Sequence, residues 1–175
     1  GSGKTAVMCA LYWALGGADL TSAIILEFTA PDGASTVSYT GAGFQPEGMI
    51  TMCAELGDDP VSTNGYTTQA LGFAAGTGTN QVAFSVGSDN DDVYTFHAVQ
   101  TSKCLHVIDV NTEAVITSAT LDSFDADGMT LTYSAGTSQN RVWALLLNGG
   151  SYKAGEILQK TSTGIQATTG IGFTP

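Results

Sequence analysis

The stretch of residues 122–150, DSFDADGMTLTYSAGTSQNRVWALLLNGG, constrains the fold more than any other part of the sequence. Its Asp127-Gly128 dipeptide favours a tight turn with positive φ between antiparallel strands. After this turn, residues 129–134 alternate between apolar and polar side chains, which is the period of a half-buried strand. Residues 142–147 include no polar member, as expected of a strand covered on both faces. The stretch therefore predicts antiparallel strands joined by tight turns.

The same kind of pattern continues through the rest of the chain. Turn signals recur at short intervals, and the 22 glycines suit turns and short strands better than helices. The strands are expected at residues 7–15, 23–30, 35–40, 48–56, 66–75, 81–87, 93–99, 103–109, 114–121, 129–134 and 142–147. No stretch has a sustained helical period. We therefore expect an all-β fold with negligible helix, an antiparallel β-sandwich of which a jelly roll is one variant.

The composition excludes several classes of protein. Hydrophobic residues make up 43% of the 175 residues and charged residues 12%, which excludes a disordered chain. Five basic residues against sixteen acidic ones give a formal net charge of −11. Since nucleic-acid backbones are bound mainly through Lys and Arg, we expect no nucleic-acid partner and no attraction to anionic membranes. The excess of acidic residues is explained by the solubility that a net charge gives to a protein.

The amino terminus suggests two interpretations that its residues do not support. The opening GSGKT lacks the first Gly of a phosphate loop, and the apolar run after it favours a buried strand over a helix. The same run resembles the apolar core of a signal peptide, but it lacks an initiator Met, so we interpret it as mature structure. The run is also too short to span a bilayer, so no membrane insertion is expected.

The three cysteines indicate no metal site. Cys9, Cys53 and Cys104 lie far apart, each within an apolar run, and they match no zinc-binding spacing. Free Cys in such a setting behaves as a small hydrophobic residue. We expect reduced thiols in a protein made in a cytosol.

Segments near the two ends of the chain repeat. GAGFQP at residues 41–46 recurs as GIGFTP at residues 170–175, with four identities in six and an offset of 170 − 41 = 129. Residues 3–17 align with residues 136–150 through a turn, an apolar strand and Gly-Gly, at an offset of 136 − 3 = 133. A period of this length is that of a domain rather than of a solenoid. Chance similarity between glycine-rich turns is the alternative.

The repeat predicts three parts in the chain. They are the closing strand of a preceding unit in residues 1–17, a complete β-sandwich unit in residues 18–150, and the start of a following unit in residues 151–175.

Pieces of the chain such as TGAGFQP, SKCLHVID, SFDADGMTLTYSAGTSQNRVWALLLNGG and TGIGFTP resemble tandem-repeat virion structural proteins of tailed bacteriophages (tail, fibre or capsid-associated). In that family a GxGFxP turn opens a strand, an FDxDGF-like hairpin follows, and the unit closes on a YLALGG-like strand. This chain departs from the pattern by having Met129 where an aromatic is usual and Leu147-Asn148 before the Gly pair. The resemblance covers nearly all of residues 20–175, and it implies a virion component without implying a chemistry.

Acidic residues gather in three predicted turns. They are Asp58-Asp59, Asp89-Asn90-Asp91-Asp92, and Asp122 with Asp125 and Asp127. Calcium binds several oxygens from one compact loop, but none of the three has the full EF-hand spacing. Because Asp also occurs in turns by bonding its own backbone, solvated turns are the alternative. The calcium candidate consists of Asp89, Asp91 and Asp92.

Histidines and aromatic residues offer two further candidate sites. His106 and Asp109 with a serine would compose a hydrolase triad, but no G-x-S-x-G elbow supports one. Aromatic side chains near turns are available to stack on sugars, whereas those within apolar runs are expected in the core. The first group is Tyr39, Tyr66, Tyr94 and Tyr152, and the second is Tyr12, Trp13, Phe84 and Trp143.

These observations predict a non-enzymatic virion structural module that self-assembles through homotypic β contacts. Its expected partners are copies of itself and other virion proteins, and its expected location is the virion, after synthesis in the host cytoplasm. The alternative function is a carbohydrate-binding adhesion module of a phage fibre or surface appendage, with glycans as partners. Neither function needs a cofactor, and calcium is the only candidate metal. A hydrolase ranks third.

Overall fold

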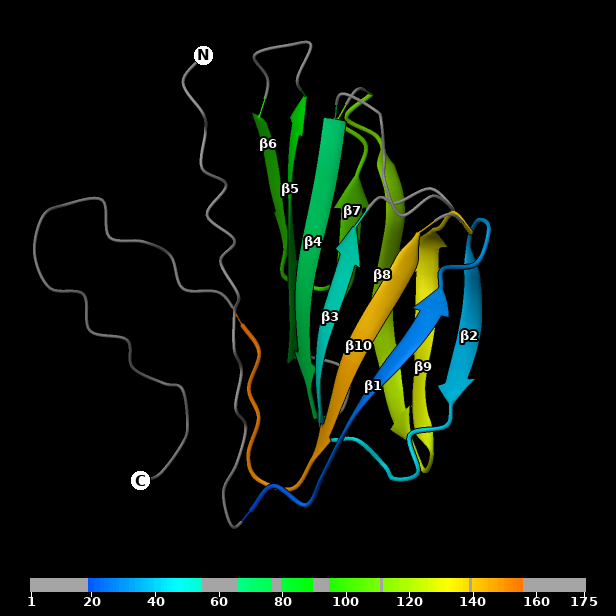
Figure 1. Ribbon diagram of the computed structural model, residues 1–175, viewed down its shortest axis with the longest axis vertical. Coiled ribbons are helices and arrows are strands. Elements are labelled where there is room, and N and C mark those ends of the chain that lie inside the picture. The colour runs from blue at the N-terminus through cyan, green and yellow to red at the C-terminus, as the bar shows by residue number, and fades with distance from the viewer. Residues whose placement is uncertain are drawn as a thin grey trace, which may run out of the picture.

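The computed structural model describes residues 19–54, 66–76, 80–89, 95–110, 112–138 and 140–155. Within them, ten strands form two antiparallel sheets that pack face to face, and there is no helix (Figure 1). The six-stranded sheet has the order β1 (Ser22–Thr29), β10 (Arg141–Asn148), β3 (Gly48–Ala54), β4 (Tyr66–Ala75), β5 (Asn80–Asp89), β6 (Thr95–Gln100). The four-stranded sheet has the order β2 (Ser35–Thr40), β9 (Gly128–Ala135), β8 (Val115–Asp125), β7 (Leu105–Ile108). The protein is an all-β sandwich, as the sequence predicted.

The strands pair in two ways. The strands nearest the two ends of the described chain pair with each other, and the strands between them form two meanders. The first strand pairs with the last, β1 with β10, and in the other sheet β2 pairs with β9. These nested pairs resemble the wrapping of a jelly roll. Strands β3 to β6 instead follow one another within one sheet, and β7 to β9 follow one another within the other.

The larger core side chains lie where β1, β10 and β3 face β2, β9 and β8. In the middle of β10 and of β9, every second residue points inward and is buried. The buried residues of these two strands include Val142, Ala144, Leu146, Leu131 and Tyr133. Phe28 of β1 stacks on Tyr39 of β2 with ring centroids 3.9 Å apart, and so connects the two sheets.

Where β4 and β5 face β7, the side chains that β4 and β5 turn inward are small, and β7 contributes the larger Leu105 and Val107. The buried positions of β4 and β5 include Thr68, Ala70, Ala74, Ala83 and Ser85. The sheets approach closely here, because a Cβ added to Gly72 would lie 1.8 Å from the carbonyl oxygen of Cys104. Small and large side chains alternate along β4 and β5, and the small ones face the core.

The β8–β9 hairpin differs by one residue from the turn expected at Asp127-Gly128. Asp125 pairs with Gly128, so the two-residue loop is Ala126-Asp127 and Gly128 already belongs to β9. The glycine at this position is required by a close approach, since an added Cβ would lie 2.0 Å from the Tyr39 carbonyl oxygen. Strand β8 also continues to Asp125 through a bulge, beyond the expected end at residue 121.

Several sequence predictions fall outside the described residues. They are the strand at 7–15, the preceding unit at 1–17 and nearly all of the following unit at 151–175. Within the part of the chain that is described, no helix has the length and hydropathy needed to cross a membrane.

Candidate interaction sites

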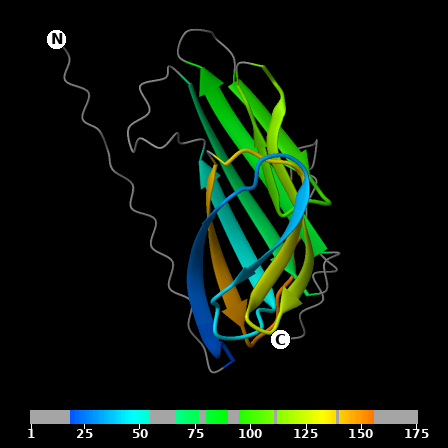
Figure 2. The same cartoon turned by 90° about the vertical axis from the view of Figure 1, so that its right-hand side faces the viewer.

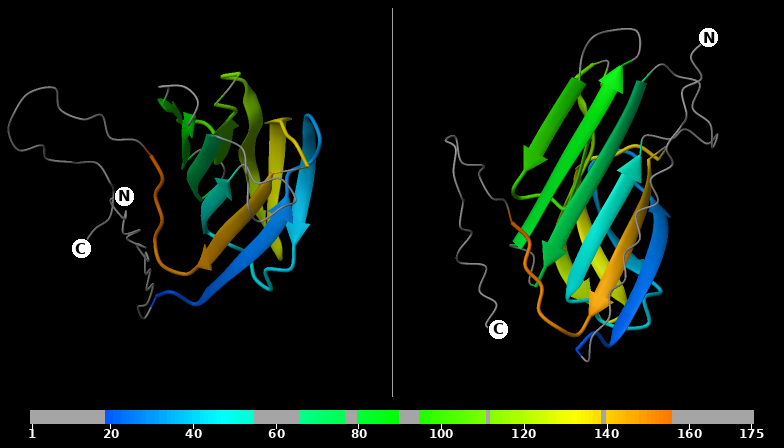
Figure 3. Two further views of the ribbon diagram at one scale, coloured as in Figure 1. Left: turned by 45° about the horizontal axis from the view of Figure 1, so that its top comes forward. Right: turned by 60° about the vertical axis from the view of Figure 1, so that its left-hand side comes forward.

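The outer face of the six-stranded sheet carries two rows of large apolar side chains, one residue from each strand in turn. The strand register places Ile25, Leu145, Ile50, Phe73 and Val82 in one row, and Trp143, Met52, Leu71, Phe84 and Val99 in the next. We call these ten residues the apolar face. The right-hand view of Figure 3 looks onto this side of the sheet. Ile25 is 64% exposed, Met52 58% and Val99 52%, so no described strand covers these positions, whereas Val82 at the other end of its row is buried.

This arrangement corrects the expectation that Phe84 and Trp143 belong to the core. Phe84 lies on the outer face and is 41% exposed, and Trp143 lies three strands away in the same row, half-buried. The inward neighbours of Phe84 in β5 are Ala83 and Ser85, which are fully buried. Strand β5 therefore turns its large side chains away from the core and its small ones toward it.

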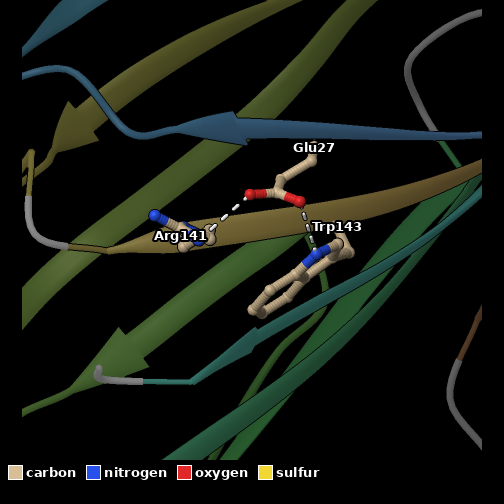
Figure 4. Close-up of polar contacts among 3 residues, drawn as sticks. All are labelled: Glu27, Arg141 and Trp143. Atoms are coloured by element: carbon tan, nitrogen blue, oxygen red, sulfur yellow. Dashed lines mark hydrogen bonds and ion pairs between the residues drawn. The ribbon is translucent and has the colours of Figure 1, made fainter. Parts of the chain in front are cut away.

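A shallow groove of about 320 Å³ crosses the apolar face, with Met52, Leu71, Phe84 and Trp143 among its walls. One charged pair, Glu27 with Arg141, lies beside the Trp143 wall of the groove, and Figure 4 shows the contacts among these three residues. Glu27 Oε1 lies 3.2 Å from an Arg141 guanidinium nitrogen, and Trp143 Nε1 donates to Glu27 Oε2 at 3.3 Å. The pair leaves this part of the surface without net charge.

The outer face of the four-stranded sheet, which is the nearer sheet in Figure 2, is polar. Hydroxyl groups pair across its strands, with Thr36 and Thr132 at 2.7 Å and Ser38 and Thr130 also at 2.7 Å. Thr130 in turn donates to Asp125 at 2.6 Å. The sandwich therefore presents one apolar and one polar outer face.

The sequence motifs meet at one end of the sandwich, where β3 begins and β10 ends. The Asp127 carboxylate accepts hydrogen bonds from the amides of Gly41 at 3.1 Å and Gly43 at 2.5 Å, which joins the hairpin to the GAGFQP turn. Asn148 Nδ2 donates to the Gln45 carbonyl at 2.8 Å, which joins the final strand to the same turn. Three segments far apart in the sequence are thus held together by side chains of the motifs themselves.

A pocket of about 490 Å³ opens at this end, and we call it the end pocket. Its walls include Gln45, Glu47, Asp122, Phe124 and Tyr152. It forms beside β8 because β7 pairs with β8 only as far as Ala119, which leaves residues 121–125 of β8 without a strand neighbour on that side. Burial, with the Glu47 charge as a second cause, raises the pKa of Tyr152.

The proposed calcium residues lie almost wholly outside the described part of the chain. Asp89 ends β5, and neither its side chain nor Asp91 and Asp92 are described. In the third acidic group, each carboxylate accepts from a different donor: Asp122 from Thr132, Asp125 from Ser123 and Thr130, and Asp127 from the two glycine amides. Among the described residues, no three His, Cys, Asp or Glu side chains gather as metal ligands.

The His106 side chain is buried, at 5% exposure, and its Nδ1 lies 3.3 Å from Ser118 Oγ. Asp109 accepts from the Thr112 amide in the turn after β7. Neither His106 nor Asp109 lines the groove or the end pocket. Burial lowers the pKa of His106, with the charge of Lys103 as a second cause.

Of the remaining predicted side chains, those of Cys9, Tyr12, Trp13, Tyr66 and Tyr94 are not described, and the others divide between core and surface. Cys53 and Cys104 are buried and not disulfide-bonded, as expected, and burial raises the pKa of the Cys104 thiol to about 12. Tyr39 is half-buried and shares a hydrogen bond of 3.0 Å with Tyr133, so it is not available for stacking on a ligand. Tyr152 lines the end pocket and is available.

No protein-family model matches the sequence, and no curated protein matches it. Among solved structures, the chain is similar to the tailspike protein of Acinetobacter phage vB_ApiP_P1, with a TM-score of 0.32 and 12% sequence identity. The match covers 81% of this chain and 24% of the tailspike chain. A similarity of this size carries no argument about function.

Proposed function

We propose that this chain is a non-enzymatic structural module of a phage virion, and that it assembles with copies of itself through the apolar face. The observation that supports the proposal is the two rows of large apolar side chains on the outside of the six-stranded sheet. Monomeric soluble proteins rarely leave so extended an apolar patch open to water. A partner that covers the face removes this surface from water.

A second copy fits the face by size. Six strands spaced by ~4.8 Å and about eight residues long on average make a face of roughly 24 by 27 Å. Two such faces pressed together bury on the order of 1,300 Å², which exceeds the ~1,000 Å² that a specific interface needs. A second copy also fits by charge. The chain carries a formal net charge of −11, but Glu27 and Arg141 cancel one another at the margin of this face, so two copies approach here with the least repulsion.

The polar face limits how such contacts grow. Because only one outer face is apolar, two copies that meet through it turn their hydroxyl-rich faces outward. Further copies would have to join at the sheet edges. The edge strand β6, with the sequence TFHAVQ, has no Lys, Glu or Pro to discourage strand addition. The resemblance to repeat-built virion proteins agrees with an assembly of many copies, together with other virion proteins.

Light scattering at micromolar concentration tests the assembly. We expect a multiple of 17.9 kDa for the wild-type chain and the monomer mass for the double substitution Met52→Lys with Phe84→Lys. The control is Ser38→Lys on the polar face, which adds a charge but should leave assembly intact. A wild-type monomer of 17.9 kDa would overturn the self-assembly. Mass spectrometry of purified virions tests the location, and absence of the chain from them would overturn that part.

A further inference from the structure

The end pocket has walls and polar groups that the fold holds in fixed positions. Its volume of about 490 Å³ lies within the range of small-molecule sites. None of its lining residues belongs to the apolar face, so it is a separate feature of the molecule.

Two aromatic rings form apolar walls of the pocket, and one of them is locked in place. The Tyr152 ring packs on the β3 backbone at Gly48, where an added Cβ would lie 2.7 Å from the ring. Its hydroxyl donates to the Gly149 carbonyl. Phe124, the second ring, packs against the core from β8. The rings are therefore positioned before any ligand arrives.

Three side chains in the pocket have one polar atom engaged by the protein and a second oxygen available. Glu47 Oε2 accepts from the Gly149 amide at 2.9 Å, and Asp122 Oδ2 accepts from Thr132. Gln45 Nε2 donates to the Phe124 carbonyl at 2.9 Å, which directs its Oε1 elsewhere. Within the described residues, no hydrogen bond engages the other oxygen of any of the three. The pocket therefore offers hydrogen-bond acceptors fixed in orientation.

We propose that the end pocket binds a neutral saccharide, through sugar hydroxyls donating to Glu47, Asp122 and Gln45 and through an apolar sugar face packing on Tyr152. Carboxylate oxygens only accept, so the ligand must supply donors, and hydroxyl groups do so at neutral charge. Among the described residues, no Lys, Arg or His lines the pocket, so an anionic sugar or a phosphate would meet the negative charge of Glu47 and Asp122. The flat apolar side of a sugar ring suits an aromatic wall.

The probes are glucose, galactose, mannose, rhamnose and N-acetylglucosamine, each added to the full chain and followed by saturation-transfer and amide-shift NMR. We expect at least one of them to bind and to shift the amides of Gln45, Glu47 and Phe124. Tyr152→Ala should weaken that sugar by at least about tenfold, while Tyr152→Phe, which keeps the ring, should stay within about threefold. Glu47→Ala tests the acceptor side and should also weaken binding.

Trp143→Ala removes the aromatic residue of the apolar face and serves as the matched control, with binding retained. The proposal is overturned by any of three results: no sugar of the panel binds, binding is lost in Trp143→Ala but kept in Tyr152→Ala, or tetramethylammonium binds in preference to every sugar. If Tyr152→Ala does not fold, the wild-type shift map decides, and shifts confined to the apolar face count against the pocket. Sugar binding and self-assembly are measured separately, so one proposal can fail while the other stands.

Discussion

The carboxylate of Asp127 accepts a hydrogen bond of 2.5 Å from the backbone amide of Gly43, 84 residues earlier in the chain. A second bond, from Gly41 at 3.1 Å, uses the other carboxylate oxygen. The FDxDG hairpin and the GxGFxP turn are therefore two halves of one structural element. Their joint occurrence in this chain has a physical reason: the acidic residue of one completes the backbone of the other.

Asp127→Ala should destabilise the protein by about 1–2 kcal/mol, because two turn amides lose a charged acceptor and water replaces it only in part. Urea unfolding monitored by circular dichroism measures the change. Asp127→Asn is the matched comparison and should cost less, since the amide oxygen still accepts one bond. Equal stability of wild type and Asp127→Ala would show that the contact contributes nothing.

Gly72→Ala should destabilise by roughly 1–3 kcal/mol through overpacking between the sheets. The added Cβ would lie 1.8 Å from the Cys104 carbonyl oxygen, which belongs to backbone and has to move as a whole. Gly155→Ala provides the control, because no atom of the described residues lies within 4 Å of a Cβ added there. Thermal unfolding of both variants should separate them clearly, and similar melting temperatures would contradict the close approach of the sheets.

Stability should fall as the pH is lowered through the unfolded-state pKa of histidine, about 6.5. Burial and Lys103 lower the pKa of His106 in the folded protein, so the unfolded chain takes up its proton first. The loss begins near that unfolded value and ends once the pH is below the folded one. Urea unfolding between pH 5 and 8 measures this slope. The dependence of the unfolding free energy on pH should be weaker in His106→Gln. An unchanged dependence in that variant would assign the effect to other titratable groups.

Asp32 should titrate below its ordinary pKa of 3.8. The Ser138 amide donates to its carboxylate at 2.7 Å, and this bond favours the charged form. Its contribution to stability is present above the unfolded pKa and is lost as the pH falls through the folded one. Carbon-detected NMR titration of the carboxyl group gives the value directly. A pKa at or above 3.8 would mean that the bond does not form in solution.

Strand positions could be predicted from the sequence because alternation and turn residues are local signals. Strand β2 has the predicted bounds, and β1, β9 and β10 lie within one residue of theirs. Which face of a strand points inward is not a local property. Phe84 and Trp143 were expected in the core because large apolar residues usually lie there. In β5 the close approach of the second sheet admits only residues such as Ala83, so the larger side chains lie outside.

The candidate sites were less predictable for a related reason. Tyr152 was singled out as an available aromatic and lines the end pocket, but Gln45, Glu47 and Phe124 carry no signal that they would share one pocket with it. They meet only because Asp127 and Asn148 draw three distant segments to the same end of the sandwich. Sequence spacing does not contain that proximity.

The small side chains that β4 and β5 turn inward make the two halves of the molecule unequal in strength. Hydrophobic stabilisation scales with the apolar area removed from water, and Ala, Gly, Ser and Thr remove little. The half with β4 to β6 is therefore the one that opens first in an isolated copy, while β1, β10 and β3 stay closed over their larger core. Contact at the apolar face would bury Leu71, Phe73 and Phe84. The apolar area buried between copies would then add to the small apolar area that this half buries in its own core. Assembly and the completion of folding then become a single event.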